Sequence, residues 1–159
     1  MFKFGPVNFG RELAMATTSK ASAVWEGVLR TGKGHYEAAS GVFRGDYSFA
    51  TRFEGAKGTN PEELLAAAHA ACFSMALAVG LELAGKPATR ISTTAACTID
   101  KVGDGFRITT MRLEVRGRVP GIDQAGFQKA AEAAKEGCPV SQALKGNLKM
   151  ELDAKLETT

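Results

Sequence analysis

The chain has 159 residues, of which 45% are hydrophobic and 23% are charged. These proportions are typical of a soluble globular domain and exclude a collagen-like, coiled-coil or disordered chain. Twenty basic and 17 acidic residues leave a formal charge of +3 and are interleaved without a Lys/Arg block, so we expect no nucleic-acid partner.

The three cysteines, Cys72, Cys97 and Cys138, are widely spaced and include no CxxC pair. This pattern argues against a secreted disulfide framework and against a structural zinc site, so we expect no metal and a reducing cytoplasm. Residues 1–15 contain no continuous apolar segment of a secretory signal. We expect residues 1–20 to form a loosely ordered extension that precedes a single domain over 21–159.

The first half of that domain is predicted to form an antiparallel β-meander. Short runs rich in β-branched and aromatic residues alternate with glycines. We expect strands over 23–29, 34–38, 42–43 and 47–53.

A long helix is predicted next, over 61–83. Asn60 can cap it, Pro61 suits its first position and Gly85 can end it. Residues 64–81 carry no formal charge, a length close to that of a membrane span. Because this run is rich in alanine and also holds His69 and Ser74, we expect no membrane span but a helix buried on all sides.

The second half is predicted to contain a hairpin, two helices and a last strand. We expect hairpin strands over 91–100 and 106–119, with a β-bulge near Thr109 and Thr110 that reconciles two phases of apolar residues. Helices follow over 123–136 and 138–144, and alternating charge predicts a half-exposed strand over 149–156. The predicted fold class is α+β, with no internal repeat.

The cysteines differ in their local surroundings. Cys72 lies mid-helix on an apolar stripe, where a buried apolar packing role is an alternative to chemistry. Cys138 directly precedes Pro139 at a helix start, where backbone N–H groups favour a thiolate. Cys97 stands in a strand pattern and is expected to fill the core. From spacing alone, a dithiol redox protein stays one possibility among others.

Longer motifs indicate which protein family the chain resembles. The strings GTNPEELLAAAHAACFSMALA (58–78) and GCPVSQALKGN (137–147) resemble the osmotically inducible protein C and organic hydroperoxide resistance (OsmC/Ohr) family. WEG (25–27), TRFEG (51–55) and VPGID (119–123) point to its OsmC branch. The resemblance extends in collinear order over residues 23–156.

This resemblance implies a thiol peroxidase that is an intertwined homodimer with helices between sheets. Cys72 matches the peroxidatic cysteine of the family and Cys138 matches its resolving cysteine. A buried thiol is weakly ionised at neutral pH, so a cation must stabilise its thiolate. By resemblance this cation is Arg52, which would also neutralise the departing alkoxide; Arg30 and Lys33 are the alternatives.

Glu62 matches the acidic partner of that arginine, although a carboxylate in the first turn of a helix also needs no catalytic explanation. Ten residues on a straight helix separate Glu62 from Cys72 by about 15 Å. We therefore expect either that Glu62 is supplied by a second subunit or that the helix is broken.

The two histidines are expected to have no catalytic role. His69 lies three residues before Cys72, which suggests a Cys-His pair or a metal site. No orienting acid is apparent and the family does not rely on a histidine base, so we expect a core or interface histidine. His35, in a predicted strand, belongs to no constellation.

The implied cycle converts the Cys72 thiolate to a sulfenic acid and then to a disulfide with Cys138. No flavin, haem or nicotinamide motif is present, so we expect no cofactor and an external dithiol reductant, by family analogy a lipoylated protein. Lining by Phe73, Met75 and Phe43 would favour organic hydroperoxides, in defence against oxidative and osmotic stress.

Two other hypotheses stay open: a non-enzymatic protein that binds a small hydrophobic ligand, and a redox sensor. An ordinary Cys72 pKa would favour the binding protein, and a lowered pKa the peroxidase.

Overall fold

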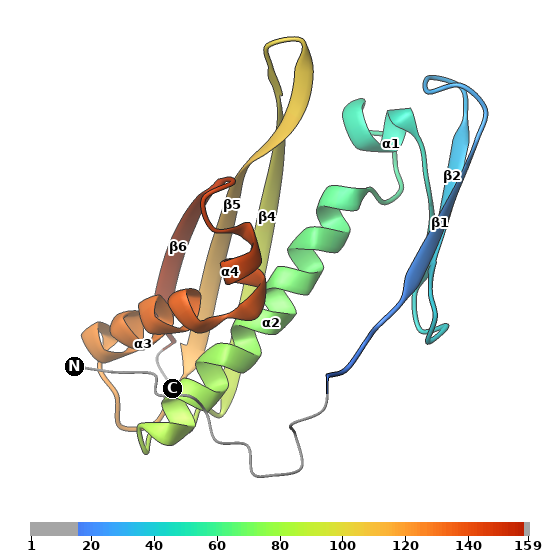
Figure 1. The fold of residues 1–159 in the computed structure, drawn as a ribbon. Helices are drawn as coiled ribbons and strands as arrows, with labels where there is room; N and C mark the ends of the chain where they lie inside the picture. The colour runs from blue at the N-terminus through green and yellow to red at the C-terminus, as the bar shows by residue number, and fades with distance from the viewer. Residues whose placement is uncertain (1–15, 158–159) are drawn as a thin grey trace. The chain divides into compact units, whose positions relative to one another are not determined.

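The computed structural model describes residues 16–157 and has a mixed α+β fold, as predicted (Figure 1). The chain forms two compact units, one from the described residues through Leu64 and the other from Leu65 onward. In chain order the elements are β1 (Ala21–Glu26), β2 (Lys33–Ala38), β3 (Arg44–Tyr47), α1 (Phe49–Phe53), α2 (Pro61–Leu83), β4 (Arg90–Val102), β5 (Gly105–Arg118), α3 (Gln124–Gly137), α4 (Pro139–Leu144) and β6 (Lys149–Leu156).

The first unit contains the antiparallel sheet β1-β2-β3. Gly34 on β2 lies beneath the ring of Tyr47 on β3, where a Cβ atom would overlap the ring. Tyr47 also lies 5.6 Å from Trp25 between ring centroids. The aromatic rings therefore pack against a strand position that only glycine can occupy.

The predicted strands over 42–43 and 47–53 are wrong. β3 begins at Arg44 and ends at Tyr47, and Phe49–Phe53 form the helix α1. Ser48 and Thr51 explain the difference, because each side chain bonds the backbone N–H of the other in a capping box. This local capping outweighs the β-propensity of the aromatic residues.

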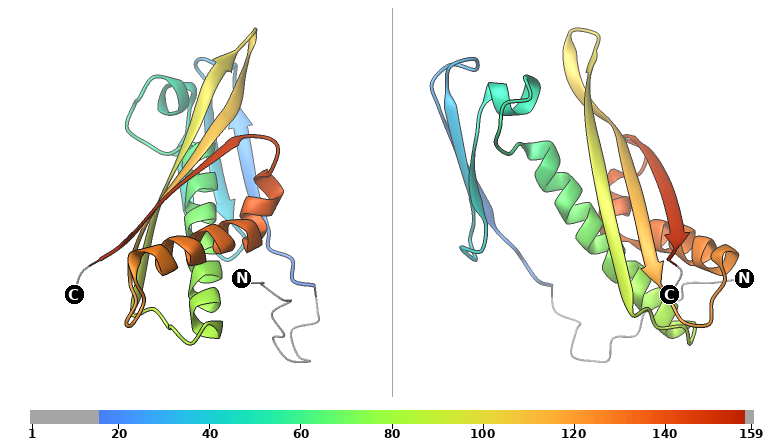
Figure 2. Two further views of the ribbon diagram at one scale, coloured as in Figure 1. Left: turned by 90° about the vertical axis from the view of Figure 1, so that its left-hand side faces the viewer. Right: turned by 180° about the vertical axis from the view of Figure 1, so that it is seen from behind.

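The second unit contains the sheet β4-β5-β6. β4 and β5 form the predicted hairpin, and β6 pairs with β5 in parallel. The register passes from Thr98 opposite Thr110 to Ile99 opposite Ile108, which leaves Thr109 as an extra residue. The predicted β-bulge is therefore present, and the hairpin extends beyond β6 (Figures 1 and 2).

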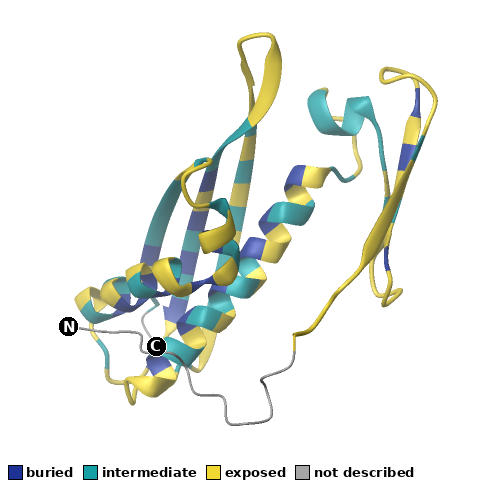
Figure 3. Ribbon diagram, in the orientation of Figure 1, coloured by how far each residue is buried: buried dark blue, intermediate teal, exposed yellow. Residues whose placement is uncertain are grey.

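The core of this unit lies where α2 and α3 cover one face of the sheet, and Figure 3 shows the buried bands along β5 and α2. Gly117 on β5 leaves room for the ring of Phe127 from α3. The core cluster consists of Phe73, Leu77, Leu81, Leu113, Val115, Val119, Phe127, Ala130, Ala131, Ala134, Cys138 and Ala154.

α2 begins and ends as predicted. The Asn60 side chain accepts a hydrogen bond from the Glu63 N–H at 2.8 Å. Gly85 has a φ of +69°, which lets the Lys86 N–H bond the Leu81 carbonyl at 2.9 Å and close the helix.

α2 is long and apolar enough to cross a membrane by length and composition alone. Phe73, Leu77 and Leu81 on this helix are instead fully buried in the core of the second unit. Met75 on α2 is 74% exposed in the single chain, so cover of this side of the helix by a second subunit stays a prediction.

The expected N-terminal extension falls mostly outside the described residues, which begin at residue 16. Residues 16–20 have no regular secondary structure and are exposed. The extent of a single domain, 21–159, stays a prediction.

Phe73→Ala should lower the free energy of unfolding by about 3–5 kcal/mol, because it opens a cavity in a fully buried site. Urea denaturation measures this change. Val42→Ala is the matched control, because Val42 is 84% exposed and its truncation should change stability by less than about 0.5 kcal/mol. A loss below about 1 kcal/mol in Phe73→Ala would contradict its place in the core.

Candidate active site

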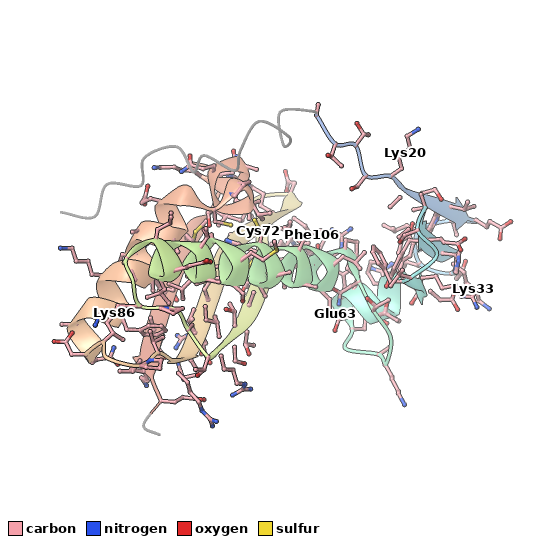
Figure 4. The ribbon with its side chains drawn as sticks, turned by 90° about the horizontal axis from the view of Figure 1, so that it is seen from below. Lys20, Lys33, Glu63, Cys72, Lys86 and Phe106 are labelled. Atoms are coloured by element: carbon pink, nitrogen blue, oxygen red, sulfur yellow. The ribbon has the colours of Figure 1, made fainter. Side chains whose placement is uncertain are left out.

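The structure brings Cys72 and Cys138 together. Cys72 lies midway along α2 (Figure 4), and Cys138 is the N-cap residue directly before α4. Their sulfur atoms are 3.2 Å apart and both thiols are free. Cys138 is fully buried, whereas Cys72 is partly exposed. The two cysteines that the resemblance singled out therefore form a contact pair, and Cys97 lies apart on β4, partly buried.

Burial raises the pKa of the Cys72 thiol above its ordinary value, and the adjacent Cys138 thiol raises that pKa further. The backbone N–H of Val140 hydrogen-bonds the Cys72 sulfur and opposes this effect. No basic side chain of residues 16–157 is among the groups that lower this pKa in the single chain. The cation that the sequence argument requires beside Cys72 stays a prediction.

The start of α4 acts on a different cysteine from the one expected. The sequence suggested that backbone N–H groups at this helix start favour a Cys138 thiolate. The Cys138 side chain makes no capping hydrogen bond, and the N–H of Val140 is directed at Cys72 instead. Cys138 is the N-cap residue of α4, and its buried side chain faces the core and the Cys72 sulfur.

Arg52 and Glu62 form a second pair. Arg52 lies on α1 and Glu62 in the first turn of α2. The Arg52 Nη2 donates to Glu62 Oε1 at 2.7 Å, and its Nε donates to both carboxylate oxygens at 3.2 Å. Glu62 is buried and Arg52 is about one third exposed. The carboxylate thus orients the guanidinium, as the resemblance implied.

These two pairs belong to different compact units, the sulfur atoms to one and the ion pair to the other. α2 is continuous from Pro61 to Leu83, so the alternative of a broken helix is wrong. Of the other basic candidates, Arg30 lies over the ring of Phe49 at 4.8 Å and Lys33 begins β2.

His69 is fully buried and its Nε2 lies 2.8 Å from the hydroxyl oxygen of Ser141 on α4. Its Nδ1 atom has no hydrogen-bond partner among residues 16–157, and burial lowers the pKa of the ring. His69 is thus a core histidine, as predicted. Within residues 16–157, no three His, Cys, Asp or Glu side chains cluster as a metal site.

Ser141 is not among the site residues predicted from the sequence. The available signal was its position three residues after Cys138, which matches the position of His69 three residues before Cys72. The other histidine, His35, contacts Asp46 at 2.8 Å on the exposed side of β2 and β3.

The expected apolar lining is partly wrong. Phe73 is fully buried in the core and cannot line a substrate pocket, whereas Met75 and Phe43 are exposed. An apolar cavity of about 250 Å³ lies beside Arg52 instead. It is lined by Trp25, Leu29, Tyr47, Ser48, Phe49, Arg52 and Phe53.

Residues 54–153 match the family model of OsmC-like proteins. The chain belongs to the OsmC-like family. It is 50% identical over 142 residues to peroxiredoxin OsmC of Escherichia coli K12, covering 89% of this chain and 99% of that protein.

The family's other branch is more distant. The organic hydroperoxide resistance protein of Xanthomonas axonopodis pv. citri is 38% identical over 99 residues, which cover 62% of this chain and 68% of that protein. The crystal structure of the organic hydroperoxide resistance protein OhrB of Bacillus subtilis matches this OsmC-like chain with a TM-score of 0.67 and 31% identity. The match covers 87% of this chain and 98% of the OhrB chain.

Stability should fall as the pH drops below about 6.5, the ordinary value for histidine, because the unfolded chain takes up a proton that buried His69 resists. Above that pH this histidine contributes no pH dependence. His69→Gln, which cannot titrate, should flatten the change in urea midpoint between about pH 5 and pH 7. An equal fall in both proteins would contradict the assignment.

Proposed function

We propose that this chain is a thiol-dependent peroxidase that reduces organic hydroperoxides to alcohols by a two-cysteine cycle in oxidative stress defence. The observation that carries the proposal is the 3.2 Å contact between the Cys72 and Cys138 sulfur atoms. A disulfide bond is about 2.05 Å long, so the sulfur atoms need approach by only about 1 Å.

The cycle balances with an external dithiol. The Cys72 thiolate attacks the hydroperoxide, the O–O bond breaks, and the alkoxide takes up a proton and leaves as the alcohol. Cys72 is then a sulfenic acid, which the Cys138 thiol attacks with loss of water to give the disulfide. A dithiol reduces this disulfide by thiol exchange and is itself oxidised to a disulfide.

The exposure of the two sulfurs favours one direction of reduction. Cys138 is fully buried and Cys72 is partly exposed, so the dithiol would attack Cys72 and release Cys138 as the leaving thiol. A lipoylated protein in the cytoplasm is the reductant that we propose by family analogy.

The ion pair supports a role for Arg52 at the sulfur. A thiol whose pKa is raised by burial needs a cation to ionise at neutral pH, and Glu62 holds the Arg52 guanidinium in one orientation. We place Arg52 and Glu62 of one subunit beside Cys72 of another, in a homodimer. The cavity beside Arg52, lined largely by aromatic rings, suits the organic tail of a hydroperoxide.

Two surfaces support the homodimer. One face of α2 exposes a continuous row of small and apolar side chains: Ala67, Ala71, Met75 and Ala78. The sheet β1-β2-β3 also has little core of its own, because among its described apolar residues only Ala38 is buried. A three-stranded sheet without a covered face is marginally stable in water, so a second copy is the natural cover.

Cys72→Ser should abolish consumption of cumene hydroperoxide, because no other group supplies the attacking sulfur. Cys138→Ser should complete one turnover and then stall or over-oxidise, because the sulfenic acid has no resolving thiol. Peroxide consumption with and without a lipoyl dithiol measures both effects. Cys97→Ser is the control and should cycle normally. Undiminished turnover in Cys72→Ser would overturn the proposed function.

Mixing two inactive variants tests the shared site. Cys72→Ser retains Arg52, and Arg52→Ala retains Cys72. If Arg52 acts across the interface, refolding equal amounts together should restore about a quarter of the active sites, because half of the dimers carry one complete site. If the mixture stays as inactive as each parent, Arg52 acts within its own chain or not at all.

A further inference from the structure

A second contact joins the two helices that carry the reactive cysteines. His69 on α2 lies 2.8 Å from Ser141 on α4, between Nε2 and the hydroxyl oxygen. Both residues are buried, His69 completely and Ser141 to 3% exposure. This polar contact takes no part in the cycle described above.

The polar pair and the sulfur pair have matching positions. His69 precedes Cys72 by three residues, and Ser141 follows Cys138 by three. Three residues are nearly one turn of helix, so the two contacts are successive rungs between α2 and α4, which run antiparallel where they meet.

Stability alone does not explain a buried histidine at position 69. Its Nδ1 atom is buried and has no partner for a hydrogen bond in the part of the chain that the structure describes, and an unpaired buried polar atom destabilises a fold relative to an apolar side chain. Burial also lowers the pKa of His69, so at neutral pH the pair is a hydrogen bond between neutral groups. Unlike apolar packing, such a bond also fixes how the two side chains are oriented toward each other.

α4 needs an external constraint on its position. It has six residues, too few to persist as an isolated helix, and its N-cap residue Cys138 makes no side-chain capping bond. On its exposed side, α4 is tethered to α3 by Gln142, which bonds the Glu136 carbonyl, and the following Lys145 bonds the Glu136 carboxylate. The bond to His69 is a buried side-chain tether to the helix that carries Cys72.

We infer that His69 and Ser141 are positioning residues that hold Cys138 against Cys72 and so set the rate of the resolving step. This inference rests on the proposed function. When the pair is intact, Cys138 attacks the Cys72 sulfenic acid and water leaves. When it is broken, a second hydroperoxide oxidises the sulfenic acid to a sulfinic acid and leaves as an alcohol.

The experiment separates the two steps of the cycle. Oxidation of Cys72 to the sulfenic acid is timed in a Cys138→Ser background, where no disulfide forms. Resolution is followed in chains with both cysteines, by acid quenching and mass spectrometry of disulfide against sulfinic product over a range of cumene hydroperoxide concentrations.

Ser141→Ala and His69→Leu should slow disulfide formation by about three- to tenfold, the effect of losing one hydrogen bond, and leave the first step unchanged. The sulfinic fraction should rise accordingly. His69→Gln should recover most of the rate, because its side-chain amide can donate to Ser141 from a position close to that of Nε2. Ser74→Ala is the matched control, since it removes a 2.8 Å bond from α2 to Thr93 on β4.

The double variant His69→Leu/Ser141→Ala provides the decisive comparison with a merely structural role. It removes both partners of the buried bond, so its melting temperature should be close to that of the natural chain while its resolving step is slow. An unchanged product ratio in His69→Leu, or equal slowing in Ser74→Ala, would overturn the inference. Normal first-step oxidation of the same variants in the Cys138→Ser background would show that the proposed peroxidase activity stands nonetheless.

If Ser141→Ala does not fold, His69→Leu and His69→Gln still decide the question. A slow Leu variant and a fast Gln variant support the positioning role. Two variants with the same resolving rate would contradict it.

Discussion

The contact between α2 and α4 is the constraint on which the chemistry depends. The two sulfur atoms are separated by 66 residues of sequence, and core packing of one compact unit brings them together. Phe73 and Leu77 are buried on α2 next to Cys72. Phe127 and Ala134 are buried on α3, the helix that precedes Cys138. The two cysteines are therefore held together by the packing of the hydrophobic core around them.

The same burial works against the first chemical step. Lowering a thiol pKa by about 3 units requires about 4 kcal/mol, and one backbone hydrogen bond such as that from Val140 contributes about 1 kcal/mol. A guanidinium can supply much of the remainder.

Pairing with Glu62 reduces the net charge that Arg52 could present to a sulfur. Because a guanidinium has five N–H donors and the carboxylate engages only Nε and one N–H of Nη2, several donors remain for a thiolate or a departing alkoxide. The ion pair thus favours directed hydrogen bonding over simple charge attraction.

Elements with local signals at their ends were predictable from the sequence. Asn60 and Gly85 delimit α2, Asp123 caps α3, and alternating charge marks β6. The helix after Tyr47 was not predicted, because its aromatic residues suggest a strand, whereas a capping box of Ser48 and Thr51 starts a helix there. The 3.2 Å sulfur contact could not follow from spacing, since loop closure over 66 residues is decided by nonlocal packing. The resemblance supplied the roles of the cysteines.

Two polar residues of α2 indicate how this helix is rotated about its own axis. A helix that is apolar on every side has no hydrophobic face to fix its rotation about its own axis. In the uncharged run over 64–81, the side chains of His69 and Ser74 each bond another element, α4 and β4 respectively. Five residues apart, they leave the helix about 140° from each other around its axis. His69 lies about 60° from Cys72 around the helix axis and directs that side of α2 toward α4, whereas Ser74 lies about 200° from Cys72 and bonds the sheet on the other side.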